Sequence, residues 1–292
     1  MLDTYENYIG KIIEKERTRR GLSVNDVCNG ICSAAACSKL ESGEYAGGIH
    51  ILRALCQRLG INSDRCGTYL PQAEYDEMMD RLYILEYIKD GKIDRAEARL
   101  ACYEKTYKKN PLNSQFVLFM RGRLAELKLN NTKAFEYYEN AVQQTMPWYA
   151  DRQNISCLTI YEAYMILGVA RIKAKLHYET AAYNLYRLLL NYCTNSNIEK
   201  WILVCIYPKA ICEMIDIIGI DKMGIMEVKD MLVHCENALN VLIDTSRLHY
   251  IRPILRNIIS FKSRLGNNDD NINDYEELPS LQMSDVLFLL TG

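Results

Sequence analysis

The chain has 292 residues, of which 49% are apolar and 25% charged, a composition typical of a globular protein that can bury one or two cores. Its formal net charge is only −2, which excludes a general attraction for nucleic acid, so that any DNA-binding surface must be local. The first residues lack a signal-peptide pattern, and no stretch reaches the ~18 uninterrupted apolar residues of a membrane helix. We therefore expect a cytoplasmic protein that does not contact a membrane.

The first 70 residues are expected to form a compact helical domain. Glycine and proline are scarce, with 15 and 6 residues, and most of them separate stretches of helical apolar periodicity. Ser23 and Asp26 have the spacing of a capping box at a helix start. The expected helices span about residues 5–20, 23–29, 33–42, 49–59 and 63–69.

Two turns within this domain have the pattern of a lambda-repressor-like helix-turn-helix. Gly-Leu-Ser at 21–23 follows a basic helix, and Ser-Lys-Leu-Glu-Ser-Gly-Glu at 38–44 follows the second turn. Such a motif places its second helix in the major groove of double-stranded DNA. The side chains expected to face base edges are Ser33, Ala34, Ala35, Ser38 and Lys39, whereas those expected to face inward are Ala36, Cys37 and Leu40.

The first helix carries a local excess of cations. Lys15, Arg19 and Arg20 are candidates for contacts with DNA phosphates, although a basic helix face is as often only solvated. Arg17 and Glu41 have a placement that suits a salt bridge between the first and third helices. Because alanines cannot make the bidentate bonds that discriminate bases, one copy should discriminate modestly, and we expect a homodimer that binds two half-sites.

From residue 71 onward the pattern is that of paired helices. First helices begin near 73, 114, 155 and 198, second helices near 94, 132, 179 and 225, and a last helix spans about 246–265. A recurrence of roughly 40 residues is an α-solenoid signature, slightly longer than a tetratricopeptide repeat. Small and aromatic residues suited to packed repeats pair as Ala96 with Tyr103, Ala134 with Tyr138, and Ala182 with Tyr186. We predict an all-α protein with a right-handed tetratricopeptide-like α-solenoid at 71–266, whose concave groove is lined by first helices.

The last segment, 267–292, is expected to be an acidic linker followed by a short apolar helix at 286–290. This helix could cap the end of the solenoid or form a dimer contact.

No pattern of catalytic residues or cofactor binding is present in the sequence. It has no Ser/His/Asp order, no glycine-rich phosphate loop and no Glu-x-x-His pair, so we expect neither enzymatic activity nor a cofactor. The eleven cysteines form no Cys-x-x-Cys pair, which argues against a metal site and for buried thiols in a reducing compartment.

With both parts placed, the sequence resembles the peptide-pheromone-responsive transcriptional regulators of Gram-positive bacteria, the Rgg/NprR/PlcR/PrgX group. The resemblance is most specific at residues 30–33 (Gly-Ile-Cys-Ser) and 38–43 (Ser-Lys-Leu-Glu-Ser-Gly), and continues at 144–147, 158–162 and 181–186. It covers nearly the whole chain, to about residue 266. It implies a cytoplasmic dimer whose repeat groove binds a short linear signalling peptide, which changes the disposition of two DNA-binding domains.

The first helices of the repeats supply the candidate peptide-binding residues. Side chains expected to line the groove are Gln115, Phe119, Arg123, Tyr161, Tyr164, Trp201 and Glu213. The resemblance adds Leu167, because Leu167 and Glu213 occupy places where members of the group commonly carry peptide-binding asparagines. These aromatic rings could equally be inter-helix packing. The predicted function is a DNA-binding transcriptional regulator that senses a peptide; the alternative is a repeat scaffold that binds another regulator protein, with a weak or vestigial DNA-binding domain.

Overall fold

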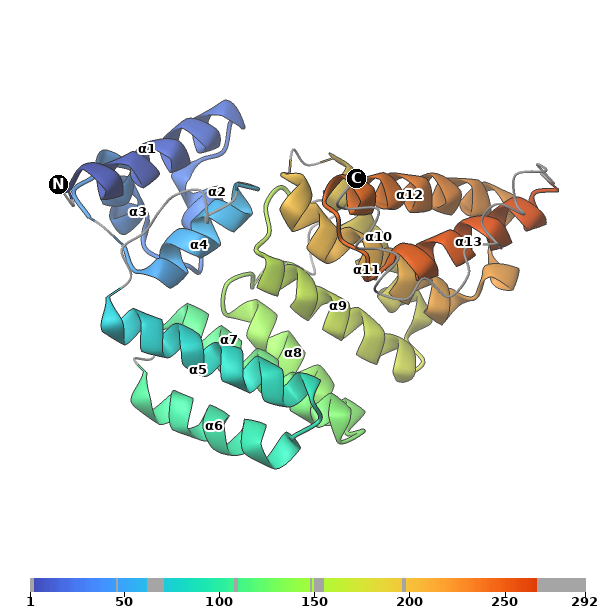
Figure 1. Ribbon diagram of the computed structural model, residues 1–292, viewed down its shortest axis with the longest axis horizontal. Helices are drawn as coiled ribbons and strands as arrows, with labels where there is room; N and C mark the ends of the chain where they lie inside the picture. Colours follow the sequence, from blue (N-terminus) through green and yellow to red (C-terminus); the bar gives the residue numbers. More distant parts are fainter. Residues whose placement is uncertain are drawn as a thin grey trace, which may run out of the picture. The chain divides into compact units, whose positions relative to one another are not determined.

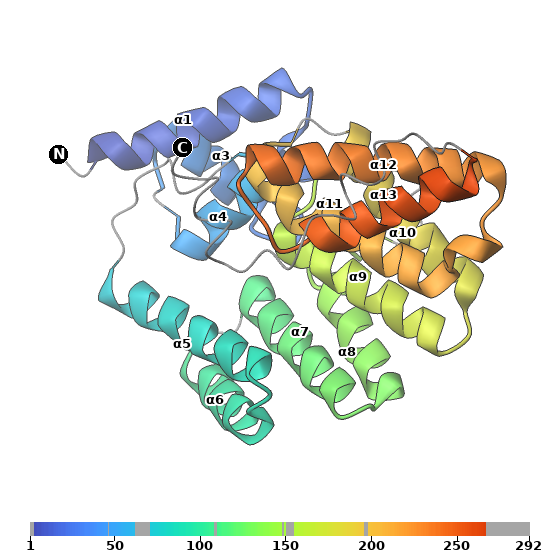
Figure 2. The same cartoon turned by 45° about the vertical axis from the view of Figure 1, so that its right-hand side comes forward.

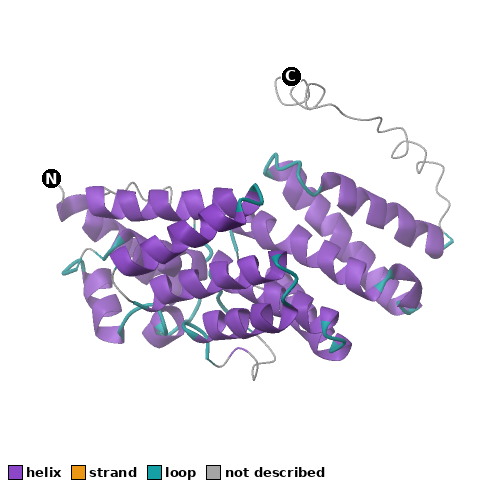
Figure 3. Ribbon diagram, turned by 90° about the horizontal axis from the view of Figure 1, so that it is seen from below, coloured by secondary structure: helices purple, strands orange, loops and turns teal. Residues whose placement is uncertain are grey.

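The computed structural model describes residues 3–45, 47–61, 71–107, 110–147, 149, 155–195 and 198–266. Within these ranges the regular elements are all helices, joined by loops (Figure 3). The predicted all-α fold is therefore confirmed. The chain divides into two compact units, Met1–Ile202 and Leu203–Gly292. The helix expected at 63–69 and the tail expected at 267–292 lie outside the described residues.

The helix-turn-helix region consists of α1 (Asp3–Arg19), α2 (Val24–Cys28), α3 (Ala34–Ser42) and α4 (Ile49–Arg58) (Figure 1). The predicted capping box starts α2: Ser23 Oγ accepts the Asp26 N–H at 3.1 Å, and Asp26 Oδ2 accepts the Ser23 N–H at 2.8 Å. Ser33 caps α3 by accepting the Ala36 N–H at 3.1 Å. These local signals explain why the sequence-based helix bounds here agree with the structure.

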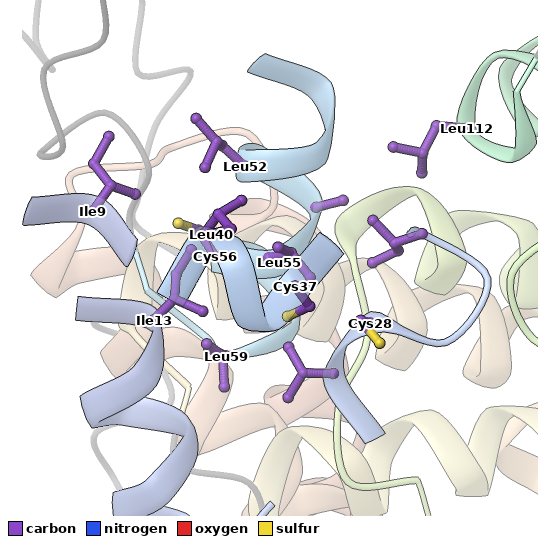
Figure 4. Close-up of a cluster of buried hydrophobic side chains, with 13 residues drawn as sticks. Ile9, Ile13, Cys28, Cys37, Leu40, Leu52, Leu55, Cys56, Leu59 and Leu112 are labelled. Atoms are coloured by element: carbon purple, nitrogen blue, oxygen red, sulfur yellow. The ribbon is translucent and has the colours of Figure 1, made fainter. Parts of the chain in front are cut away.

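Apolar side chains from all four helices form the core of the helix-turn-helix region (Figure 4). Ile9 and Ile13 of α1 lie with Leu40 of α3, and Gly10 lets the α1 backbone approach so closely that a Cβ there would overlap the Leu40 carbonyl. The same cluster includes Leu112, from α7 of the repeats. This core therefore extends into the repeat helices.

The repeat helices of the first unit are three pairs (Figure 2). They are α5 (Gln72–Lys89) with α6 (Ile93–Thr106), α7 (Pro111–Leu127) with α8 (Asn131–Gln143), and α9 (Ile160–Lys175) with α10 (Glu179–Asn195). Asn110 caps α7 by accepting the Asn113 N–H at 2.9 Å, with Pro111 in the first helical turn. The other five helices begin close to the predicted positions, whereas α9 begins at Ile160 and not near 155.

Small residues let the repeat helices pack closely around an aromatic ring. The Tyr138 ring of α8 is fully buried, and a Cβ added at Gly122 of α7 or at Gly168 of α9 would overlap it. The predicted pairs of alanine and tyrosine, Ala96 with Tyr103, Ala134 with Tyr138, and Ala182 with Tyr186, are all buried. Interlocking of this kind buries the apolar faces that a single repeat would leave exposed.

The second unit contains most of α11 (Lys200–Ile218), a short 3-10 helix η3 (Ile220–Lys222), α12 (Ile225–Asp244) and α13 (Ile251–Arg264). Tyr207 Oη lies 2.7 Å from His234 Nδ1 in its interior. Several large apolar side chains of α12 remain at the surface: Ile225, Met226, Val233 and Ile243 are 55–78% exposed. This unit therefore keeps an apolar surface on α12.

No disulfide joins the cysteines among the described residues, and most of these thiols are buried, as expected. In this part of the chain, no group of three or more His, Cys, Asp or Glu side chains is placed to hold a metal ion. The described helices include none that has both the length and the apolar character needed to cross a membrane.

Candidate functional site

The outer face of α3 has the surface expected of a recognition helix. Ser33, Ala34, Ala35, Ser38 and Lys39 are all exposed, while Cys37 and Leu40 are buried and Ala36 is intermediate. The cap at Ser33 starts the helix at its Ala34 end, and Gly43 ends it in the left-handed conformation with φ 80°. The structure thus presents the five predicted base-facing side chains together, and their contact with DNA stays a prediction.

The three predicted phosphate contacts of the first helix and its following turn differ in accessibility. Lys15 is exposed, and Arg19 is exposed but paired with Glu16, 2.7 Å away. Burial lowers the pKa of Arg20, and the other groups that act on it include Tyr192 of α10 and Cys157. Arg20 is therefore on the side of the region that meets the repeats, and Lys15 and Arg19 remain the accessible cations.

Arg17 and Glu41 form the salt bridge predicted between the first and third helices. Arg17 Nε and Nη2 donate to the two Glu41 carboxylate oxygens at 2.7 and 2.8 Å, and Arg17 Nη1 donates to the Leu22 carbonyl at 3.0 Å. The fork geometry makes this a strong pair. Its role is structural, because both partners are satisfied within the helix-turn-helix region.

A cavity of about 490 Å³ lies within the first unit, in the size range of ligand pockets. First helices supply most of its wall: α5, α7 and α9, with Trp201 at the start of α11. Helix α4 of the helix-turn-helix region supplies the rest, through His50, Arg53, Ala54 and Gln57. We call it the junction cavity, since both the helix-turn-helix region and the repeats line it.

The walls of the junction cavity are mainly apolar and aromatic. Tyr161 of α9 meets the rings of Phe116 and Phe119 of α7 edge to face, with centroids 6.2 and 5.9 Å apart. Further lining residues are Met78, Leu82, Leu85, Leu112, Ile160 and Met165. Such walls suit apolar side chains of a ligand.

Six predicted groove residues line the junction cavity: Gln115, Phe119, Arg123, Tyr161, Tyr164 and Trp201. The other two lie elsewhere. Leu167 is fully buried in the packing of α9, and Glu213 belongs to the second unit, where its carboxylate lies 3.8 Å from Lys209 Nζ. Sequence reasoning also missed the contribution of α4, for which the sequence shows no local signal.

A buried ion pair joins α4 to α9. Arg58 Nη2 and Nε donate to the two Glu162 carboxylate oxygens at 2.5 and 3.3 Å, and the two side chains are only 1% and 0% exposed. Burial alone would lower the pKa of Arg58 and raise that of Glu162, but each partner shifts the other the opposite way, so both stay charged. Arg58 Nη1 also donates to the Val27 and Asn29 carbonyls at 2.9 and 2.7 Å. One guanidinium thus ties the turn after α2 to the first turn of α9.

Hydrogen bonds continue from this ion pair to the wall of the junction cavity. Thr145 Oγ1 donates to Glu162 Oε1 at 2.6 Å and accepts from Gln115 Nε2 at 2.6 Å. Gly30, with φ 75°, lies directly on the Thr145 backbone, which a Cβ would overlap. We call Gln115, Thr145, Glu162 and Arg58 the junction network. It links the cavity-lining Gln115 to the turn that precedes α3.

Comparison with known proteins supports the fold. No protein-family model matches the chain, and no curated protein matches it significantly. Among solved structures, it is similar to PlcR of Bacillus thuringiensis in complex with the peptide PapR7 and DNA: the identity is 15%, the TM-score is 0.53, and the match covers 98% of this chain and 95% of PlcR.

Another solved structure found is the apo form of the competence regulator ComR from Streptococcus vestibularis, with 14% identity, a TM-score of 0.47, and coverage of 98% of this chain and 96% of ComR. PlcR is one of the proteins after which the group resembled by the sequence is named. The helix-turn-helix plus tetratricopeptide-like fold that this resemblance implies is therefore confirmed.

Proposed function

We propose that the chain is a DNA-binding transcriptional regulator whose junction cavity binds a short signalling peptide. The observation that carries this proposal is that one unit contains both an exposed recognition helix and a cavity of ligand size, with α4 shared between them. The similarity to PlcR, solved with a peptide and DNA, agrees with it. The candidate sites are the exposed α3 face with Lys15 and Arg19, and the cavity-lining aromatic residues with Gln115 and Arg123.

The recognition helix presents two alanines where a discriminating helix would carry amides or guanidiniums. Ala34 and Ala35 can contact a thymine methyl group but cannot form bidentate hydrogen bonds with a base. We therefore propose a homodimer that binds two half-sites. The exposed apolar side chains of α12 supply a candidate dimer surface, because apolar patches of this kind commonly mark protein contacts.

The DNA-binding proposal is tested by selection from random double-stranded DNA with the purified full-length chain, at low and at moderate salt. Enrichment of an inverted repeat supports it, and the Lys39→Ala variant should enrich a different or weaker motif. If nothing is enriched and binding is absent even at low salt, the chain is better described as a repeat scaffold for another regulator.

The homodimer is tested by light scattering at tens of micromolar. The wild type should be dimeric, and Val233→Glu, which places a charge on the apolar surface of α12, should shift it toward monomer. Arg95→Glu, which places the same charge at an exposed position on α6 of the first unit, is the control and should stay dimeric. A wild-type chain that is monomeric both free and on DNA would contradict the dimer.

A further inference from the structure

The junction cavity has an uneven distribution of charge. Its lining includes three arginines, Arg53, Arg81 and Arg123, and no aspartate or glutamate. His50 also lines it, but burial lowers the pKa of this imidazole, so His50 is neutral near pH 7. The cavity wall is therefore cationic as well as apolar.

Arg81 is already satisfied by the protein. Its Nε donates to Tyr103 Oη at 2.8 Å, its Nη2 donates to Asn113 Oδ1 at 2.6 Å, and the Glu77 carboxylate lies 3.4 Å away. The Arg81 guanidinium also stacks on the Phe116 ring, 4.7 Å from its centroid. Because Arg81 and Glu77 carry opposite charges, the pair adds little net charge to the cavity wall.

Arg53 of α4 is in a different position. Its only hydrogen bond among the described residues runs from Nη1 to Met78 Sδ at 3.4 Å, and a thioether is a weak acceptor. The side chain is half-buried at the cavity wall. Burial raises the pKa of the Tyr161 hydroxyl, while the charges of Arg81 and Arg53 oppose that rise, so both guanidiniums act on the same ring of the wall.

A half-buried guanidinium without a carboxylate partner favours an anionic group in the adjacent space, because the planar fork of arginine matches a carboxylate. The neighbouring aromatic and aliphatic wall favours apolar side chains beside that group. We infer that the ligand of the junction cavity is an apolar peptide bearing a carboxylate, and that this carboxylate pairs with Arg53. This inference rests on the proposed peptide-sensing function.

The inference means that the ligand contacts the helix-turn-helix region directly. Arg53 is on α4, five residues before the Arg58 that holds the turn after α2. The carboxylate can be an Asp or Glu side chain or the free carboxyl terminus of the peptide. Both carry the same chemistry, and an experiment must separate them.

The test uses mixed pentapeptides of Leu, Ile and Phe with one fixed position, on the full-length Trp148→Phe chain, in which cavity-lining Trp201 is the remaining tryptophan. Three libraries are blocked at both ends and carry Asp, Asn or Lys at the fixed position. A fourth carries Asn and a free carboxyl terminus. Binding is followed by Trp201 fluorescence.

The Asp library, the free-carboxyl library, or both should bind at least ~10-fold more tightly than blocked Asn, and the Lys library most weakly. Whichever arm shows the gain identifies the source of the carboxylate. Arg53→Gln should abolish this preference, and Arg53→Lys, which keeps the charge but loses the fork, should retain part of it. Arg95→Gln, at an exposed position on α6, is the matched control and should retain all of it.

Three results are decisive against the inference. Peptide binding without preference for the anionic libraries would overturn it and leave the peptide-sensing function in place. A preference retained in Arg53→Gln but lost in Arg123→Gln would overturn the assignment to Arg53. If no library binds the wild-type chain at millimolar concentration, the proposed peptide-sensing function fails, and this inference fails with it.

Discussion

Two arginine–glutamate pairs stabilise the helix-turn-helix region. One joins two helices within the region, and the other joins the region to the repeat helices. Arg17–Glu41 links α1 to α3 inside the region, with side chains 16% and 7% exposed. Arg58–Glu162 links α4 to α9 across 104 residues of sequence, with side chains 1% and 0% exposed. The first pair fixes the internal geometry of the region. The second pair fixes the position of the helix-turn-helix region on the repeat helices. The contact between α4 and α9 therefore depends on buried charges, whereas the exposed face of α3 does not.

Breaking the pair at the junction should have the largest effect. Glu162→Gln leaves the Arg58 guanidinium buried without its counter-charge, and removing one partner of a buried pair typically costs about 3–5 kcal/mol. Denaturant unfolding followed by circular dichroism measures the loss. Arg58→Met with Glu162→Leu removes both charges and should cost less than either single change. Single variants that lose under about 1 kcal/mol would show that the pair is not desolvated as the structure describes.

The same pair predicts a pH dependence. The folded-state pKa of Glu162 is depressed. Burial alone would raise this pKa, but Arg58, Thr145 and the Thr159 N–H lower it by more than burial raises it. Its stabilising contribution is therefore complete above the ordinary pKa of 4.5 and is lost as the pH falls through the depressed value. Between pH 7 and pH 3, wild-type stability should fall more steeply than that of Glu162→Gln. Parallel curves would contradict this assignment.

A matched pair of glycines tests the packing beside the ion pair. Gly30 and Gly21 both have positive φ, 75° and 66°, so alanine at either place costs about 1–2 kcal/mol in backbone strain. At Gly30 the added Cβ would also overlap Thr145, whereas at Gly21 it meets nothing within 4 Å. Gly30→Ala should lose roughly 1–3 kcal/mol more than Gly21→Ala in thermal or denaturant unfolding. Equal losses would mean that the turn does not pack on the repeats.

The internal pair should have a smaller effect than the pair at the junction. Glu41→Gln removes a charge-assisted fork that is partly open to solvent, so we expect a loss of about 1–3 kcal/mol in the free energy of unfolding. Peptide binding by the junction cavity should be unchanged, because neither Arg17 nor Glu41 lines it. A loss as large as that of Glu162→Gln would remove the distinction between the two pairs.

Substitutions at the exposed cations of α1 and α3 should have the smallest effects on stability and distinct effects on DNA binding. Lys39 and Arg19 are exposed, so Lys39→Ala and Arg19→Ala should each change stability by under about 0.5 kcal/mol. Lys39→Ala should alter sequence preference, whereas Arg19→Ala should weaken all sequences alike and reduce the salt slope by about 1. Binding titrations at several salt concentrations measure both. Identical behaviour of the two variants would defeat the assignment of roles.

Local patterns in the sequence predicted much of this structure. Apolar periodicity and the Ser23–Asp26 capping box indicated where helices begin, and these signals act over a few residues. The helical period correctly predicted that the side chains of Cys37 and Leu40 face inward. The positions of Arg17 and Glu41 in the helix-turn-helix correctly predicted their salt bridge.

The missed features depend on contacts between distant segments. Arg58 resembles a surface cation in the sequence, and only the packing of α4 against α9 makes it a buried partner of Glu162. The same packing brings Arg53 to the cavity wall. Leu167 is on a first helix as expected, but its direction is set by packing within α9 and its neighbours, which a repeat period does not specify.

DNase footprinting of the purified chain on the DNA next to its own gene shows whether the chain binds specific DNA as a dimer. We predict protection of two half-sites whose centres are a whole number of helical turns apart. Added salt should weaken this protection, and Lys39→Ala should alter it. The absence of protection by folded protein at micromolar concentration and low salt, on this DNA and on unrelated DNA alike, would contradict it.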